Sequence, residues 1–84
     1  MNITLKLYAT LSDLLPSGAT DNSATIQVDE TTSLNQIIDK YRVPRKLAHL
    51  VLINGVFVCE ADRDQSGVFK DGDVLAIWPP VAGG

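Results

Sequence analysis

The first residues of the chain alternate between apolar and polar side chains. Apolar residues occupy every second position across residues 3–7, which is the pattern of a strand with one buried face. A second alternating segment covers residues 24–28, and we expect it to pair with the first as an antiparallel hairpin. The connection is expected to hold a helical turn at residues 11–15 and an irregular, mobile polar loop at residues 17–23.

The clearest helical pattern lies in the middle of the chain. Ser33 is a suitable N-cap, and Gln36, three residues later, completes a capping box. Four apolar residues recur at the spacing of one helix face: Leu34, Ile37, Ile38 and Tyr41. We expect this face to pack against the sheet. Val43-Pro44 is expected to end the helix, because proline disfavours helical geometry in the residue before it.

The second half of the chain predicts three further strands. Asn54-Gly55 separates two β-rich runs, residues 50–53 and 56–59, and both central residues of a type I′ turn need the positive φ that Asn and Gly tolerate. A turn at residues 70–73 precedes the apolar run 74–78. An unbroken apolar run is typical of a central strand, so we expect this last strand to lie in the middle of the sheet.

This order of elements predicts an α+β fold, with one main helix on one face of a mixed sheet of four or five strands. Because the helix lies between the first hairpin and the last strands, the final strand can lie parallel to the first and beside it. That arrangement is the β-grasp, or ubiquitin-like, fold. We expect residues 1–78 to form this domain and residues 79–84 to form an extended tail.

Composition narrows the possible functions. The 84 residues include seven basic and ten acidic side chains, for a net charge of −3, with one cysteine and one histidine. This length supports one domain. Cys59 has no partner for an internal disulfide, and one Cys with one His cannot supply a four-ligand zinc site, so we expect no bound metal. The acidic balance disfavours nucleic acid and anionic membranes as partners.

The sequence has no recognisable targeting or membrane-spanning pattern. No basic cluster leads into an apolar stretch at the start, and no apolar run approaches the ~20 residues that a bilayer demands. The unpaired cysteine suits a reducing compartment. We therefore expect a cytoplasmic location.

The last six residues, Pro79-Pro80-Val81-Ala82-Gly83-Gly84, have the features of a tail that enters another protein. Two prolines remove two backbone donors, so strand pairing cannot continue past Trp78. Extended, the tail reaches roughly 20 Å. Its two glycines let the backbone pass through a channel too narrow for any side chain.

The chemical group at the tip of the tail is the α-carboxylate of Gly84. An α-carboxyl group with its ordinary pKa of about 3.3–3.7 is ionised at neutral pH, and it can attack the α-phosphorus of ATP if an enzyme holds both. The sequence itself has no glycine-rich phosphate loop, no carboxylate pair placed for Mg²⁺ and no nucleophile with a nearby base. We therefore expect the protein to be a substrate and carrier, not an enzyme.

The C-terminal residues resemble a known family. Lys70-Asp71 followed by Gly-Asp-Val-Leu-Ala-Ile-Trp-Pro-Pro-Val-Ala-Gly-Gly is similar to the C-terminal signature of the MoaD/ThiS sulfur carriers. The resemblance covers the whole chain in length and element order, and the last fifteen or so residues are its specific part. The double proline favours the branch of MoaD, the small subunit of molybdopterin synthase, over the thiamine carrier ThiS.

The resemblance implies a reaction cycle centred on Gly84. An adenylating enzyme of the ubiquitin-activating type (MoeB/ThiF-like) would use ATP and Mg²⁺ to form an acyl-adenylate, while this chain itself would bind no cofactor. A sulfur donor such as a cysteine desulfurase or rhodanese would convert the adenylate to a thiocarboxylate. The tail would then enter the large synthase subunit (MoaE-like) and transfer sulfur to a pterin precursor. Two loaded carriers would supply the dithiolene that binds molybdenum or tungsten.

A partner surface is expected beside the exit of the tail. Tyr8 and Trp78 should lie on the sheet face opposite the helix, on adjacent strands, and aromatic residues at such positions are typical binding anchors. Together with Pro79, Pro80, Val81, Ala82 and Gly83, they form the predicted partner-binding set. The resembling family uses an apolar surface there for both enzymes. Alternatively, Trp78 is a core residue and Tyr8 only covers its neighbour.

Other residues with reactive or charged side chains favour structural interpretations. Cys59 is expected to be a small buried apolar residue and not a sulfur-relay thiol, and His49 a surface or capping histidine. Three acidic residues lack the later glycine and glutamate of a calcium loop, and three basic residues are too few to bind nucleic acid. We expect both groups to be solvated: Glu60, Asp62 and Asp64; Arg42, Arg45 and Lys46.

Three rival functions stay open alongside the molybdopterin carrier. One is a carrier for thiamine or another sulfur-containing product. Another is a ubiquitin-like modifier joined to lysines of target proteins through Gly84. The third is a β-grasp binding module that is never activated. The sequence does not distinguish molybdenum from tungsten use, nor does it indicate the identity of the sulfur donor or the oligomeric state.

Overall fold

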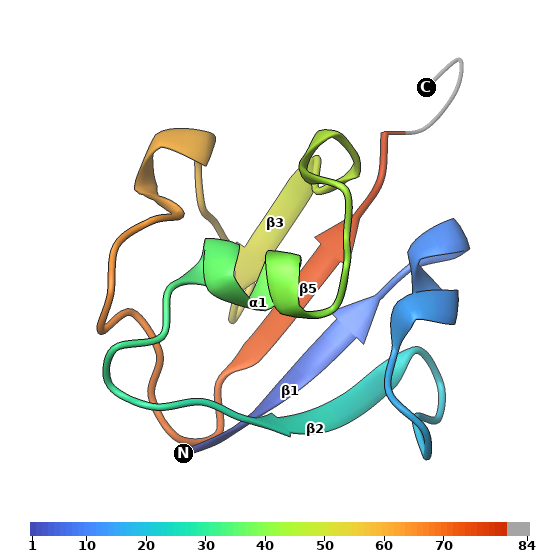
Figure 1. Ribbon diagram of the computed structural model, residues 1–84, viewed down its shortest axis with the longest axis horizontal. Helices are drawn as coiled ribbons and strands as arrows, with labels where there is room; N and C mark the ends of the chain where they lie inside the picture. The colour runs from blue at the N-terminus through green and yellow to red at the C-terminus, as the bar shows by residue number, and fades with distance from the viewer. Residues whose placement is uncertain (81–84) are drawn as a thin grey trace.

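The computed structural model describes residues 1–80, which form a five-stranded sheet with one α-helix across one face (Figure 1). The strands are β1 (Asn2–Leu7), β2 (Ser23–Gln27), β3 (Leu50–Ile53), β4 (Val56–Phe57) and β5 (Val74–Trp78), and the helix is α1 (Leu34–Lys40). Three 3₁₀ segments lie in the connections: η1 (Ala9–Leu14), η2 (Arg45–Leu47) and η3 (Glu60–Asp62). The predicted α+β, β-grasp fold is confirmed.

The last strand occupies the centre of the sheet, as predicted. The strand order is β2-β1-β5-β3-β4, and β5 runs parallel to β1 and antiparallel to β3. Leu5 of β1 lies opposite Leu75 of β5. The predicted antiparallel pairing of β1 with β2 is also present, with Ile3 opposite Ile26. The first and last strands, β1 and β5, therefore lie side by side in the sheet (Figure 1).

The hydrophobic core lies between α1 and the sheet. Leu34, Ile37 and Ile38 of the helix are buried, as the predicted apolar face requires. Alternate residues of the three inner strands complete the core: Ile3, Leu5, Leu7, Val51, Leu75 and Ile77. Burying side chains of this size stabilises the fold by about 1.5–3 kcal/mol each. We call the opposite side of the sheet, which no helix covers among residues 1–80, the open face (Figure 1).

The helix begins as predicted. The Ser33 hydroxyl accepts a hydrogen bond from the Gln36 N–H at 3.2 Å, and the Gln36 side-chain oxygen accepts one from the Ser33 N–H at 2.9 Å. Both bonds of the capping box are therefore present. Such a cap is worth about 1 kcal/mol because it satisfies N–H groups that have no partner within the helix.

The helix ends earlier than Val43-Pro44. Its last residue is Lys40, and Arg42 has a left-handed φ of 60°. The N–H of Val43 donates to the Ile38 carbonyl at 2.9 Å, and that of Arg42 donates to the Asp39 carbonyl at 3.1 Å. This pair of bonds is a Schellman motif. The helix is thus ended by a C-terminal cap centred on Arg42, two residues before the proline could act.

Two of the predicted turns are present as expected. Asn54 and Gly55 have φ values of 50° and 83°, as a type I′ turn requires. The Asn54 side chain also bonds to the start of β5, donating to Asp73 at 2.8 Å and accepting from the Val74 N–H at 2.9 Å. Gly72 has a φ of 88° in the turn before β5.

The connection between β1 and β2 is more regular than predicted. The expected helical turn is the 3₁₀ segment η1, whose Leu11 is buried. The later part of the predicted irregular loop contains a tight turn, in which Asp21 and Asn22 have φ values of 51° and 64°. Thr20 and Ser23 exchange two backbone hydrogen bonds around it, of 3.0 and 2.9 Å. Asp and Asn tolerate left-handed geometry well enough to form this hairpin turn without glycine.

The prediction that Cys59 is buried is wrong. The predicted strand at residues 56–59 is only the two-residue β4, and Cys59 lies beyond it as the cap residue of η3, exposed to solvent. Its thiol contacts the Asp62 carboxylate, with the sulfur 3.1 Å from Oδ2. The Val58 N–H donates to the Val51 carbonyl, and the chain leaves the sheet after this bond. The alternation of buried and exposed strand residues therefore ends before residue 59.

Candidate functional site

The tail begins at the end of the central strand. Trp78 is the last residue of β5, and its carbonyl accepts a hydrogen bond of 3.2 Å from the His49 N–H. Pro79 is half-buried and Pro80 is exposed. Because neither proline has an N–H, the ladder ends here. The other predicted tail residues, Val81, Ala82, Gly83 and Gly84, lie outside the described residues.

An aromatic pair lies beside the start of the tail. Tyr8 directly follows β1, and its N–H donates to the Ile77 carbonyl at 3.2 Å, which continues the parallel pairing by one residue. The rings of Tyr8 and Trp78 stack with centroids 4.2 Å apart and planes at 1°. Both residues are half-buried. The sequence predicted these two residues on one face of adjacent strands, and the structure confirms that placement.

The aromatic pair is one end of a larger apolar surface on the open face. Residues directly opposite one another in paired strands point to the same face, and Leu50 lies opposite Trp78 while Leu52 lies opposite both Ala76 and Phe57. Leu50 is 39% exposed and Phe57 is 55% exposed. We define the open-face patch by the residues that share this surface: Tyr8, Leu50, Leu52, Phe57, Ala76 and Trp78.

The sequence patterns did not predict the part of this patch contributed by β3 and β4. The sequence does contain a signal for the contact between these two strands, because a two-residue turn at Asn54-Gly55 fixes Leu52 opposite Phe57. Placing Leu50 and Leu52 beside Trp78 and Ala76 required a further step, the pairing of β3 with β5. That pairing joins residues far apart in sequence, and no local pattern reports its register.

A buried arginine supports the start of the tail and was also missed. Arg63 is 5% exposed, and its guanidinium donates to the carbonyls of Ala48 at 2.7 Å, His49 at 3.4 Å and Val58 at 3.2 Å. It therefore fixes the segment whose His49 N–H meets the Trp78 carbonyl. Arginine is rarely buried unless hydrogen bonds occupy its N–H donors, as these three do. Nothing in the polar run around Arg63 signals that this residue is buried.

The remaining polar candidates are surface groups. His49, Glu60, Asp62 and Asp64 are exposed, as are Arg42, Arg45 and Lys46. Arg45 forms a two-bond ion pair with Asp39, at 2.7 and 3.1 Å, and this hydrogen bonding holds the pKa of the Asp39 carboxyl below its ordinary value of 3.8. Hydrogen bonds from Thr31 and Thr32 lower the pKa of Asp29 in the same way.

The described residues hold no group suited to bind a metal. Across residues 1–80, no three His, Cys, Asp or Glu side chains come together in a way that could hold an ion. In the same part of the chain, no helix has both the length and the apolar character needed to cross a bilayer. The features that remain near the tail are the aromatic pair, the open-face patch and the Arg63 support.

This combination defines a class of protein: a small ubiquitin-like domain whose C-terminal segment follows directly from its central strand. A model of the ThiS family matches residues 5–84. The chain therefore belongs to the ThiS family, with the fold of the MoaD/ThiS carriers. Members of this family are small carrier proteins.

Solved structures support the same fold. The solution structure of the HVO 2177 protein of Haloferax volcanii is 25% identical, with a TM-score of 0.72 over 100% of this chain and 87% of that one. SAMP1 of the same organism is 22% identical, with a TM-score of 0.66 over 100% of both chains. A chain from the complex of subunits 1 and 2 of molybdopterin-converting factor of Helicobacter pylori is 17% identical, with a TM-score of 0.61 over 100% of both chains. A search of curated proteins returns no match.

Proposed function

We propose that the protein is a sulfur carrier that acts through the terminal carboxylate of Gly84 in the synthesis of molybdopterin. The observation that carries the proposal is the sequence Pro-Pro-Val-Ala-Gly-Gly placed directly after a central strand with an aromatic pair at its end. Membership of the ThiS family supports carrier chemistry. The double proline supports the molybdopterin branch, as the resemblance to MoaD implies.

The proposed loading reaction involves two displacements at the end of the chain. A carboxylate oxygen of Gly84 would attack the α-phosphorus of ATP held with Mg²⁺ by a MoeB/ThiF-like enzyme, and pyrophosphate would leave. A persulfide sulfur from a cysteine desulfurase or rhodanese would attack the acyl carbon, and AMP would leave. A thiol would then attack the donor cysteine's sulfur in this acyl disulfide, which breaks the S–S bond that came from the persulfide, releases the thiocarboxylate and leaves the donor cysteine in a disulfide with that thiol. This chain would supply the reacting carboxylate and the surface that places it, and the process would take place in the cytoplasm.

The open-face patch would be the contact surface for the two enzymes. Its Phe57 and Leu50 are large apolar side chains left exposed at 55% and 39%, and exposed apolar residues grouped on one face mark interaction sites. The patch is continuous with the start of the tail through Trp78. A partner that covered the patch would therefore receive the tail in a defined direction. The complex of subunits 1 and 2 from H. pylori, whose chain shares this fold, supports a MoaE-like second partner.

A ubiquitin-like modifier is the second candidate, favoured by the fold shared with SAMP1. A reconstituted acceptor assay separates the candidates. The thiocarboxylated protein is mixed with a MoaE-like subunit and its pterin precursor, and separately with a thiazole-forming system. Dithiolene formation in the first mixture supports the proposal. Sulfur transfer only in the second would assign a ThiS-like role, and stable isopeptide adducts on lysines with no sulfur transfer would assign a modifier.

A further inference from the structure

The outer edge of β2 is an unpaired strand edge. Met1 and Val28 exchange backbone hydrogen bonds, each of 2.9 Å, and bonded pairs alternate along an antiparallel ladder. The N–H and C=O groups of Ala24 and Ile26 therefore point to β1, while those of Thr25 and Gln27 point away from the sheet. Within residues 1–80 no strand lies beyond β2. Thr25 and Gln27 thus offer two donors and two acceptors at the spacing of alternate residues in an extended chain.

This edge lacks the devices that usually block strand addition. Natural edge strands are commonly protected by proline, by charged residues, by bulges or by being very short. The opposite edge strand, β4, has only two residues. In contrast, β2 has five residues, Ser-Ala-Thr-Ile-Gln, with no proline and no charge. The two edges of the sheet therefore differ in their ability to accept another strand.

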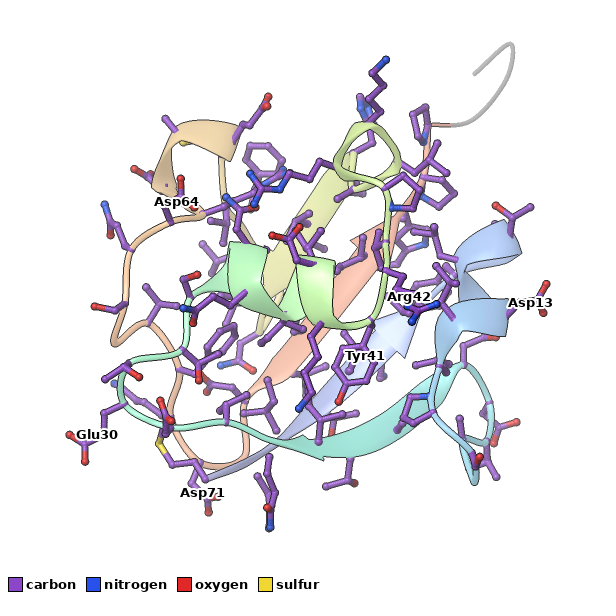
Figure 2. All side chains as sticks on the ribbon, viewed as in Figure 1. Asp13, Glu30, Tyr41, Arg42, Asp64 and Asp71 are labelled. Atoms are coloured by element: carbon purple, nitrogen blue, oxygen red, sulfur yellow. The ribbon has the colours of Figure 1, made fainter. Side chains whose placement is uncertain are left out.

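A groove runs alongside the β2 edge on the helix side. It has a volume of about 200 Å³ and lies between β2 and α1, where Ile26, Val28, Ile37 and Tyr41 form its apolar lining. Figure 2 shows the Tyr41 ring on the side of α1 nearest β2. Side chains of an added strand alternate between the two faces, so every second one would point into this groove. The volume suits about one or two aliphatic side chains.

The charge beside the groove indicates what kind of segment fits. Lys40 lies on the groove wall, with its ammonium 5.7 Å from the centroid of the Tyr41 ring. Among residues 1–80 the one ion pair is that of Arg45 with Asp39, so no described carboxylate neutralises Lys40. An acidic residue next to the apolar side chains would meet this cation at the margin of the groove.

We propose that the β2 edge and the adjoining β2–α1 groove bind an extended partner segment by strand addition, and that this segment carries alternating aliphatic residues with an acidic residue beside them. Backbone bonds to Thr25 and Gln27 would provide affinity, while the groove and Lys40 would select the side chains. This site is separate from the open-face patch and the tail. The protein could therefore bind such a partner while its C-terminus is being loaded.

The proposal is tested by titrating the ¹⁵N-labelled full chain with an acetylated, amidated peptide Thr-Val-Thr-Val-Asp-Asp. The amide signals of Thr25 and Gln27 should shift, with little change at Leu50 and Phe57 on the open face. The same peptide with N-methyl groups on alternate residues cannot form the ladder and should bind at least about tenfold more weakly. Shifts centred on the open face, or equal binding of the methylated peptide, would overturn the proposal.

Two pairs of variants test the individual contributions. Lys40→Glu should raise the peptide Kd about fivefold, while Lys6→Glu, the same charge change on the open face, should leave it unchanged. Thr25→Pro removes one outward N–H without touching the β1 ladder and should weaken binding, whereas Thr25→Ala should not. Equal effects within either pair would contradict the site. Self-association through β2 in the absence of peptide would instead assign the edge to a second copy of the chain.

Discussion

Tyr8 and Trp78 come from the two ends of the domain, yet their rings lie face to face, 4.2 Å apart and parallel within 1°. The contact exists because β1 and β5 pair in parallel, so that the C-terminal ends of both strands lie next to each other. Each ring stabilises the position of the other beside the first residue of the tail. The geometry therefore places the proposed partner surface directly beside the start of the tail.

Replacing Trp78 tests that link. Trp78→Ala should weaken binding to an adenylating partner by tenfold or more, about 1.4 kcal/mol. Because Trp78 is only half-buried, the free energy of unfolding should fall by a smaller amount, about 1 kcal/mol. Calorimetric titration and urea unfolding measure the two effects, and Tyr8→Phe is the control because it keeps a stacked ring. Unchanged affinity for the partner would rule out a binding role for the patch.

Replacing Arg63 tests the support of the tail's first residue. Arg63→Met keeps the bulk of the side chain but removes three hydrogen bonds to buried or half-buried carbonyls, so it should destabilise the domain by about 2–3 kcal/mol. Arg63→Lys should recover part of this loss, since lysine retains the charge but not the planar fork. Chemical unfolding provides the values, and hydrogen exchange at the His49 amide provides a local readout. Loss of less than about 0.5 kcal/mol in Arg63→Met would show that the bonds are dispensable.

Arg42 is the position where a substitution should stabilise the protein. Its φ of 60° at the helix C-terminus is strained for a side chain and favourable for glycine. Arg42→Gly should therefore raise the free energy of unfolding by about 0.5–1 kcal/mol. Lys40→Gly, at the last helical position, should lower it by up to about 1 kcal/mol. Matched urea titrations compare the two, and a destabilised Arg42→Gly protein would contradict the assigned cap.

Asp39 should show the pH response of a hydrogen-bonded carboxylate. The Arg45 side chain holds the Asp39 pKa below 3.8 in the folded state, so the folded protein binds this proton more weakly than the unfolded chain does. The stabilisation is then fully present above the unfolded pKa and is lost as pH falls through the folded pKa. A carbon-detected NMR titration should place the Asp39 midpoint below 3.8, and Arg45→Gln should raise it. An unchanged midpoint in Arg45→Gln would exclude the ion pair as the cause.

Local signals in the sequence predicted the local structure well. The capping box of Ser33 with Gln36 and the Asn54-Gly55 turn both depend on residues within a few positions of one another, so their chemistry can be recognised directly. The same holds for the alternation that places Tyr8 and Trp78 on one face. The α+β, β-grasp fold followed from the order of these elements.

The features that the sequence did not reveal depend on tertiary context. Arg63 is buried because the carbonyls of Ala48 and His49, from the segment before β3, converge on it together with that of Val58, and no neighbouring residue signals this convergence. Cys59 is exposed because β4 ends after Phe57, although the apolar run continues. The turn at Asp21-Asn22 and the cap at Arg42 use left-handed geometry at residues other than glycine, and such positions are hard to anticipate when no glycine marks them.

The central claim concerns one functional group, the terminal carboxylate of Gly84, and intact mass spectrometry tests it most directly. The full chain is incubated with a MoeB/ThiF-like enzyme, ATP, Mg²⁺ and a sulfide source, and a variant lacking Gly84 is treated in parallel. The account predicts a gain of about 16 Da in the full chain, the difference between sulfur and oxygen. It predicts no gain in the variant, whose fold should be intact because the deletion removes only a terminal residue. An unmodified full chain with every adenylating partner, or an equal gain in the variant, would contradict it.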